Sequence, residues 1–187
     1  AARAAEAQLA SGIDLGPLRP CLPERLPEGR RIALAPEPML QDLDRLRAAH
    51  PQGGAPAGDG LALIGRRQLR DNNYWLRNAP ALAKGRPRCT LRVHPDDARA
   101  RGLAEGDLAV LASRVGRVTV PVEITDEVMR GVVCLPHGWG HDKPGTRVAV
   151  ASRHAGVCNN AIAPGELVDV PSGNAIVNGI PVEVSPA

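Results

Sequence analysis

The sequence predicts a mainly β protein with short helices, whose strands close into a barrel that follows an irregular, partly helical N-terminal extension. Short apolar runs recur between residues 61 and 184, with many of the 20 glycines and 18 prolines standing between them, which is typical of a chain with many turns. Aromatic residues make up only 2% of the chain, so the core must consist of Val, Leu, Ile and Ala, and this favours strands packed on strands. A length of 187 residues fits one domain, or one domain with an extension.

The N-terminal third of the sequence predicts an extension and a linker. Residues 1–50 are expected to be the tail of a preceding domain or a connector, with one helix over 36–49 whose leucines recur at helical spacing. A short strand is predicted at 31–35. Residues 51–60, PQGGAPAGDG, predict a flexible linker. Because the sequence begins within a connector and lacks an initiator methionine, we expect it to be a piece of a longer protein.

Residues 61–187 are predicted to form the barrel domain. Six apolar runs predict its strands, at 61–64, 89–93, 108–113, 118–124, 132–135 and 182–184. The third and fourth runs flank Val115–Gly116 and are expected to form a hairpin. Three further segments are predicted to be a helix at 94–102, a short helix or two turns at 74–83, and an additional strand at 148–151. This pattern predicts a closed barrel without separating one type of barrel from another.

Charge and composition exclude several classes of protein. The net charge is +3, and the positive charge is almost entirely arginine, a bias that genome composition explains for the most part. No basic stripe is interleaved with aromatic residues, so we expect no nucleic-acid partner. No apolar run approaches 18 residues, and we predict no membrane contact for this segment.

The four cysteines are far apart and form no C-x-x-C pair, so they do not match a zinc or an iron–sulfur pattern. We expect all four (Cys21, Cys89, Cys134 and Cys158) to be buried free thiols. Nothing in this pattern indicates an oxidising compartment, so we expect a cytoplasmic rather than a periplasmic location.

No self-contained active site is evident in the sequence. None of the serines lies in a G-x-S-x-G setting, so a hydrolase triad is not indicated. His137 and His141 have the i, i+4 spacing of two metal ligands on a helix, but the glycines at 138 and 140 make a helix improbable there. We therefore predict no catalytic residue and no metal ligand in this chain, and the two histidines are expected to hydrogen-bond to the backbone of their loop.

A ligand site is nevertheless indicated by the stretch 61–78, LALIGRRQLRDNNYWLRN. A short apolar strand ends at Gly65 and is followed by arginines and side-chain amides. These donors converge at one edge of a sheet, which suits an anionic ligand rich in hydrogen-bonding groups, such as a cofactor that carries phosphate. The alternative is an ordinary strand followed by a solvated polar loop.

Two further stretches have the same character. Residues 131–141 read GVVCLPHGWGH, and a later segment holds Asn159 and Asn160 followed by a D-x-x-S-G turn. The order LIGRR, NNYWLRN, PHGWGH, NN and D-x-x-S-G over residues 61–184 closely resembles the C-terminal cofactor-binding domain of molybdopterin oxidoreductases, the group of formate dehydrogenase, periplasmic nitrate reductase and DMSO reductase. The resemblance implies that the barrel is a six-stranded double-psi barrel.

The resemblance also implies a cofactor and partners. The cofactor would be molybdenum bis(molybdopterin guanine dinucleotide), which this domain lines without supplying the molybdenum ligand. That ligand, and any iron–sulfur cluster, would belong to the missing upstream part. The implied partners are the upstream catalytic domains of the same polypeptide and an electron-transfer subunit. The parent would move electrons between a substrate at molybdenum and an acceptor, and this piece alone would not be catalytic.

Carried over by position, the resemblance assigns cofactor contacts to residues of three loops and of the C-terminal segment. These are Gly65, Arg66, Arg67, Arg70, Asn72, Asn73, His137, Trp139, Asn160 and Asn178 (or Gly179). For Asn72 and Asn73 the alternative is that they cap a helix beginning at Tyr74. We expect Trp75 to lie in the core.

The sequence departs from the family pattern at two places. Arg70 and Asp71 stand where family members often have a histidine or tryptophan, and Ile162–Ala163 stands where many have Leu–Thr. The alternative function is a stand-alone double-psi barrel that serves as a binding or adaptor module, of the kind found beside ATPases. Such a module would fold and work without a pterin. An independent small hydrolase is a third reading, for which no nucleophile–base pair is visible.

Overall fold

A computed structural model of the protein describes residues 16–26, 31–49 and 60–187. The chain divides into two units, Ala1–Asp44 and Arg45–Ala187. The predicted linker at 51–60 lies outside the described residues except for Gly60, and so do parts of the predicted extension. Within the described ranges, no helix is long and apolar enough to cross a membrane.

Two helices are described before the barrel, α2 (Leu22–Arg25) and α3 (Glu37–Ala49). The helix predicted at 36–49 is therefore confirmed, and the carbonyl oxygen of Pro36 accepts hydrogen bonds from the amides of Met39 and Leu40 at its start. The strand predicted at 31–35 is wrong, because this segment is irregular. A strand needs a partner for its backbone groups, and no described segment pairs with this one.

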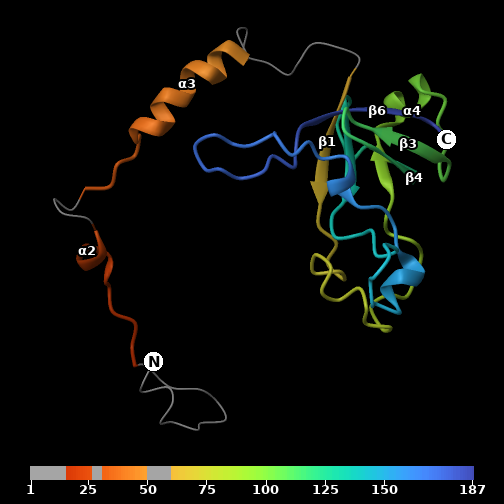
Figure 1. The fold of residues 1–187 in the computed structure, drawn as a ribbon, viewed down its shortest axis with the longest axis horizontal. Helices are drawn as coiled ribbons and strands as arrows, with labels where there is room; N and C mark the ends of the chain where they lie inside the picture. Colours follow the sequence, from red (N-terminus) through yellow and green to blue (C-terminus); the bar gives the residue numbers. More distant parts are fainter. Residues whose placement is uncertain (1–15, 27–30, 50–59) are drawn as a thin grey trace. The chain divides into compact units, whose positions relative to one another are not determined.

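The barrel consists of six strands, all of which were predicted (Figure 1). They are β1 (Leu61–Arg66), β2 (Leu91–Val93), β3 (Leu108–Ala112), β4 (Arg117–Ile124), β5 (Val132–Pro136) and β6 (Ile180–Pro186). The strands close in the order β1-β5-β2-β4-β3-β6. The β1–β5 and β2–β4 pairs are parallel and the other four are antiparallel. This crossed arrangement of two parallel pairs in a closed six-stranded barrel is a double-psi barrel, and the predicted fold class is confirmed.

The interior of the barrel is aliphatic, as the composition predicted. Alternate residues of β1, β3 and β6 are buried, in keeping with the two-residue repeat of a strand that has one face in a core. The largest fully buried apolar side chains are Leu63, Leu91, Leu111, Leu135, Ile162 and Ile180. No aromatic side chain belongs to this core cluster.

The helices between the strands are short. Helix α4 (Pro95–Ala100) confirms the prediction at 94–102, and its first turn is capped by the Nδ1 atom of His94, which accepts from the amide of Asp96. Two 3₁₀ helices follow β5, η1 (Ala151–His154) and η2 (Asn159–Ala161).

Two other predicted elements lie in the loops of the barrel. Residues 74–83 form turns rather than a helix. The strand predicted at 148–151 is wrong, because this segment turns into η1. The Oδ1 atom of Asn78 accepts hydrogen bonds from the amides of Val150 and Ala151, at 2.9 and 3.2 Å, and thus takes the donors that a sheet would need.

The cysteines are free thiols, but they are not all buried. Cys89 and Cys134 are buried, whereas Cys158 is half-buried and Cys21 is exposed. Cys21 precedes α2 and has no core to enter, because its apolar neighbours Leu18 and Leu22 are exposed as well.

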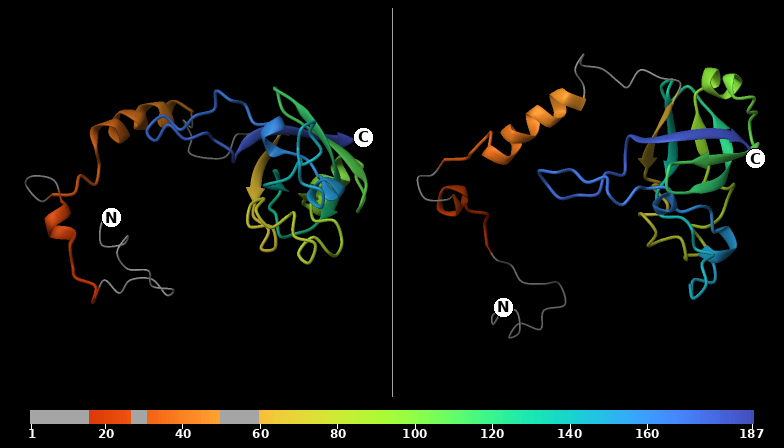
Figure 2. Two further views of the ribbon diagram at one scale, coloured as in Figure 1. Left: turned by 60° about the horizontal axis from the view of Figure 1, so that its bottom comes forward. Right: turned by 45° about the horizontal axis from the view of Figure 1, so that its top comes forward.

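The loops that follow β1 and β5 gather at one end of the barrel (Figures 1 and 2). This placement follows from the parallel β1–β5 pair, since parallel neighbours end on the same side. A long loop between η2 and β6 projects away from the barrel in both figures and is held by a bridge between Val168 and Ala175. The end of the barrel below β1 and β5 is therefore where the predicted site residues lie.

Candidate functional site

A small pocket lies where β1 and β5 end. The amide of His137 donates to the carbonyl oxygen of Arg66 at 2.9 Å, which continues the parallel pairing of the two strands into their loops. The amide of Gly65 donates to the Oδ1 atom of Asn178 at 2.7 Å, and the amide of Gly179 donates to the carbonyl oxygen of Leu63 at 2.8 Å. Segments that are far apart in the sequence are thereby fixed around one cavity.

The cavity has a volume of about 90 Å³ and a mixed lining. Five of the predicted contacts line it, together with one polar residue that was not predicted and four apolar residues. They are Gly65, Arg67, His137, Asn160 and Asn178, then Asn159, and then Leu63, Ala163, Val177 and Ile180. Apolar walls with a few placed polar groups are typical of a small-molecule site.

Gly65 leaves room in this pocket. A Cβ atom at this position would lie 3.5 Å from the Oδ1 atom of Asn178 and 3.9 Å from the Nδ2 atom of Asn159, both ordinary contact distances. The glycine is therefore not required by a clash within the chain. Any larger side chain would instead extend into the space between the two amides, which the glycine leaves open.

Asn159 is the functional candidate that the sequence analysis missed, since it selected the neighbouring Asn160. The Oδ1 atom of Asn159 is buried and has no hydrogen-bond partner among the described residues. Its Nδ2 atom lies 3.5 Å from the carbonyl oxygen of Leu135. A buried acceptor without a donor is costly, so this oxygen is a suitable partner for a donor on a ligand. The paired asparagines were the available signal, and η2 places both of them at the pocket.

His137 and Arg67 set the electrostatics of the pocket. Burial lowers the pKa of His137, and the positive charge of Arg67 lowers this pKa further. The imidazole is therefore neutral at neutral pH and offers one donor and one acceptor. Arg67 is exposed and supplies the positive charge of the pocket.

Arg66 differs from the expectation. Its guanidinium turns into the barrel wall, where it donates to the carbonyl oxygen of Cys134 at 2.8 Å and to the Oγ1 atom of Thr90 at 2.9 Å. It also lies 3.5 Å from the Glu123 carboxylate. The side chain of Arg66 is thus committed to protein groups, and Arg66 does not line the pocket.

Trp139 also differs from the expectation that its ring packs on a flat ligand. The residue is only 7% exposed. The guanidinium of Arg77 lies over the ring, and a Cβ atom at Gly156 would meet the ring at 2.5 Å. Because Arg77 and Gly156 already pack on the indole, Trp139 is part of the structure that supports the loops.

The remaining predicted contacts lie on the loop after β1 and do not line the pocket. Arg70 and Asn72 are exposed, and Asn72 and Asn73 have left-handed backbone angles, with φ of 42° and 63°. Neither asparagine caps a helix, because residues 69–78 form turns. Trp75, which was expected in the core, is 71% exposed and stacks on Tyr74.

A metal centre is not indicated. No group of three or more His, Cys, Asp or Glu side chains that could hold a metal ion occurs in the described ranges. The ring of His141 instead contacts the carbonyl oxygen of Gly138 at 3.1 Å, which matches the expected role of a loop histidine that binds backbone.

The family model described as "Molydopterin dinucleotide binding domain" matches residues 61–177, which include β1 to β5 and most of the pocket. The chain belongs to this family. The predicted resemblance is confirmed, and the cofactor class of this family is a molybdopterin dinucleotide.

Individual relatives match shorter parts of the chain. It is 41% identical over 59 residues to the dimethyl sulfoxide/trimethylamine N-oxide reductase of Rhodobacter capsulatus, a match of 29% of this chain and 7% of that protein. It is 35% identical over 88 residues to the biotin sulfoxide reductase of Cereibacter sphaeroides, a match of 46% of this chain and 12% of that protein. The chain therefore spans a small fraction of the length of these relatives.

The fold of this molydopterin dinucleotide-binding domain also occurs in a solved structure. Acetylene hydratase from Pelobacter acetylenicus superposes with a TM-score of 0.58 at 18% sequence identity, covering 79% of this chain and 20% of that one. At this identity the match establishes the shared fold.

Proposed function

We propose that this domain is the C-terminal cofactor-binding part of a molybdenum oxidoreductase that carries two molybdopterin guanine dinucleotides. The observation that carries the proposal is the pocket itself, in which Gly65, His137, Asn159 and Asn178 come together from four segments of a dinucleotide-binding domain. The names of the curated relatives, which are reductases of sulfoxides and N-oxides, support the redox assignment.

The pocket residues fit a pterin, whose ring edge carries both donors and acceptors. The unpaired Oδ1 atom of Asn159 would accept from a donor of the ring, and the neutral imidazole of His137 would offer a donor and an acceptor. Arg67 would pair with negative charge on the cofactor. Asn178, which holds the amide of Gly65, would fix the backbone against which the ligand rests.

The roles of this domain in the parent are to bind and to orient. The molybdenum cofactor, when bound, supplies the redox chemistry, and the side chains of this barrel provide no catalytic residue. The upstream catalytic domains of the same polypeptide would hold the rest of the cofactor and any iron–sulfur cluster, and an electron-transfer subunit would take up or deliver the electrons. We propose a cytoplasmic location for the parent.

The test uses the full-length polypeptide that contains this chain. Acid treatment releases the guanine nucleotide, and oxidation converts the pterin to a fluorescent product, so both are quantified per mole of polypeptide. We expect Asn159→Ala to lower both amounts several-fold. The midpoint of thermal unfolding of the cofactor-free polypeptide should change little, because the lost oxygen has no protein partner and the lost hydrogen bond from Nδ2 to the carbonyl oxygen of Leu135 is long, at 3.5 Å.

Asn174→Ala is the matched control, since Asn174 is exposed in the projecting loop and hydrogen-bonds there through its backbone. It should retain the wild-type content of nucleotide and pterin. Equal cofactor content in Asn159→Ala and wild type would contradict the role of the pocket. A wild-type polypeptide without any pterin would favour the adaptor module instead.

A further inference from the structure

A second cavity, of about 260 Å³, shares no lining residue with the pterin pocket. Four arginines line it: Arg77 from the loop after β1, Arg86 and Arg88 from the segment before β2, and Arg153 from η1. No Asp or Glu is among the described residues that line it. Such an excess of positive side chains around one concave space is unusual without a ligand of opposite charge.

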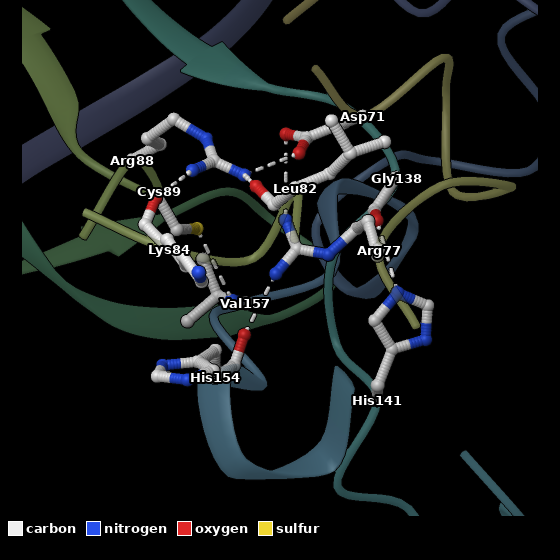
Figure 3. Close-up of polar contacts among 10 residues, drawn as sticks. All are labelled: Asp71, Arg77, Leu82, Lys84, Arg88, Cys89, Gly138, His141, His154 and Val157. Atoms are coloured by element: carbon white, nitrogen blue, oxygen red, sulfur yellow. Dashed lines mark hydrogen bonds and ion pairs between the residues drawn. The ribbon is translucent and has the colours of Figure 1, made fainter. Parts of the chain in front are cut away.

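Two of these arginines are held in place by Asp71, which is fully buried (Figure 3). Its Oδ1 atom lies 2.7 Å from Nη2 of Arg88, and its Oδ2 atom lies 3.5 Å from Nη1 of Arg77. Arg77 also donates to the carbonyl oxygen of His154 at 2.8 Å, and Arg88 donates to that of Leu82 at 3.2 Å. One carboxylate thus orients two guanidiniums and neutralises only one of their charges.

The lining also contains donors that lack an acceptor. The Nε atoms of Arg77 and Arg88 and the Nε1 atom of Trp139 are buried and have no hydrogen-bond partner in the described part of the chain. Burial, with a smaller effect of the positive charge of Arg88, lowers the pKa of Arg77 to about 10, although Asp71 acts to raise it. Burial raises the pKa of the Cys89 thiol, which therefore adds no negative charge at neutral pH.

The two outer arginines are free to bind a ligand. Arg86 and Arg153 are exposed, and their guanidiniums have no ion pair or hydrogen bond within the described ranges. Arginine forms bidentate hydrogen bonds with the oxygens of phosphate more readily than any other side chain. The rest of the wall includes His154, Cys89 and Trp139 together with an apolar part, Ala83, Pro87, Pro121 and Ala155, which could contact the organic part of a phosphate ester.

We propose that this arginine pocket binds a phosphate group, with Arg86 and Arg153 as the closing contacts and the Asp71-oriented pair of Arg77 and Arg88 as the fixed base. The phosphate is either part of a bound dinucleotide or a separate ligand. Both kinds of phosphate would make the same contacts with the arginines. They differ in one respect, since only a phosphate of the dinucleotide would occupy the site once the cofactor is bound.

The experiment titrates inorganic phosphate into the full-length polypeptide by isothermal titration calorimetry, using protein from cells that cannot make the pterin cofactor. We expect saturable binding at one site per chain. Arg86→Ala/Arg153→Ala should weaken it at least about tenfold, since each arginine supplies charge-assisted hydrogen bonds. Both residues are exposed and unpaired, so the variant should unfold at the wild-type temperature.

Arg117→Ala/Arg130→Ala is the control, because it removes the same charge from exposed positions outside the pocket and should bind phosphate as wild type does. Absence of saturable binding in wild type, or equal weakening in the control, would overturn the proposal. The same titration with cofactor-loaded protein identifies the source: lost binding assigns the site to the dinucleotide, and retained binding assigns it to a separate phosphate. Because the cofactor-free protein is titrated first, the phosphate-binding proposal is tested independently of the proposed cofactor role of the other pocket.

Discussion

The backbone of Gly138 lies directly against the carbonyl group of Asn73, so closely that a Cβ atom on Gly138 would overlap it. Gly138 has a φ of +85°, and Asn73 has a φ of 63°. Both are left-handed conformations, which glycine adopts freely and asparagine tolerates better than most residues. This contact joins the loop after β1 to the loop after β5, and thereby fixes the two sides of the end of the barrel that holds the pockets.

Replacing Gly138 with alanine should destabilise the fold. The new methyl group would meet the Asn73 carbonyl and would also impose strain at a positive φ, at a combined cost of about 2–4 kcal/mol in the free energy of unfolding. Urea unfolding measures this cost. The matched control is Gly145→Ala, because Gly145 has a φ of +86° with nothing near its Cβ position. A loss no larger than that of the control would show that the contact with Asn73 is unimportant.

Replacing Asp71 with asparagine should strongly destabilise the fold. Arg77 and Arg88 would lose their buried counter-charge, and breaking a buried pair on one side typically costs about 3–5 kcal/mol. Chemical unfolding at neutral pH measures the loss. Asp96→Asn is a control on the surface, where the ion pair of Asp96 with Arg99 is solvated, and it should leave the unfolding midpoint nearly unchanged. Equal midpoints for the two variants would mean that the Asp71 cluster does not hold the loops.

The stability of the protein should depend on the ionisation of His137. Its pKa is lowered in the folded state, first by burial and then by Arg67, so the unfolded state binds more protons in this range. Neutral His137 therefore contributes its full share of the folding stability above the ordinary histidine pKa of about 6.5. This share is lost as the pH falls through the pKa of His137 in the folded state.

Unfolding free energies measured between about pH 7 and pH 5 test this dependence. His137→Gln cannot take up a proton and should show a smaller decrease on acidification than wild type. His154→Gln retains His137 and should keep the wild-type slope. Identical slopes for wild type and His137→Gln would contradict the lowered pKa.

The barrel strands could be predicted because their signals are local. Alternating apolar residues and turn glycines lie within each segment, as in 108–112 and 117–124, and closure follows from the number and spacing of the strands. The segments 31–35 and 148–151 carry similar apolar runs. They form no strand, because a strand also needs a neighbouring strand to pair with. A local apolar run does not predict whether such a neighbour is present.

The site was predicted at the level of loops more than of side chains. Arg66 was expected at the cofactor, but Glu123 on β4 and Thr90 before β2 take its guanidinium, and both are distant in sequence. Arg77 and Gly156 likewise cover Trp139. Asn178 lines the pocket, as do both Asn159 and Asn160, and how each of these two faces the cavity depends on the orientation of a short 3₁₀ helix.

The neighbours of β1 in the barrel have a consequence for the order in which the protein can assemble. Among the strands of the barrel, β1 is synthesised first, yet it pairs with β5 and β6, the last two of the barrel. Both edges of β1 therefore stay unpaired until β5 and β6 have been synthesised. Closure of the barrel depends on contacts between distant segments, which makes it slow. The pocket at the ends of β1 and β5 needs Gly65 beside Asn178, so it exists only after β6 has docked. A ligand of this pocket therefore binds only the closed barrel, and its binding free energy adds to the stability of the folded state.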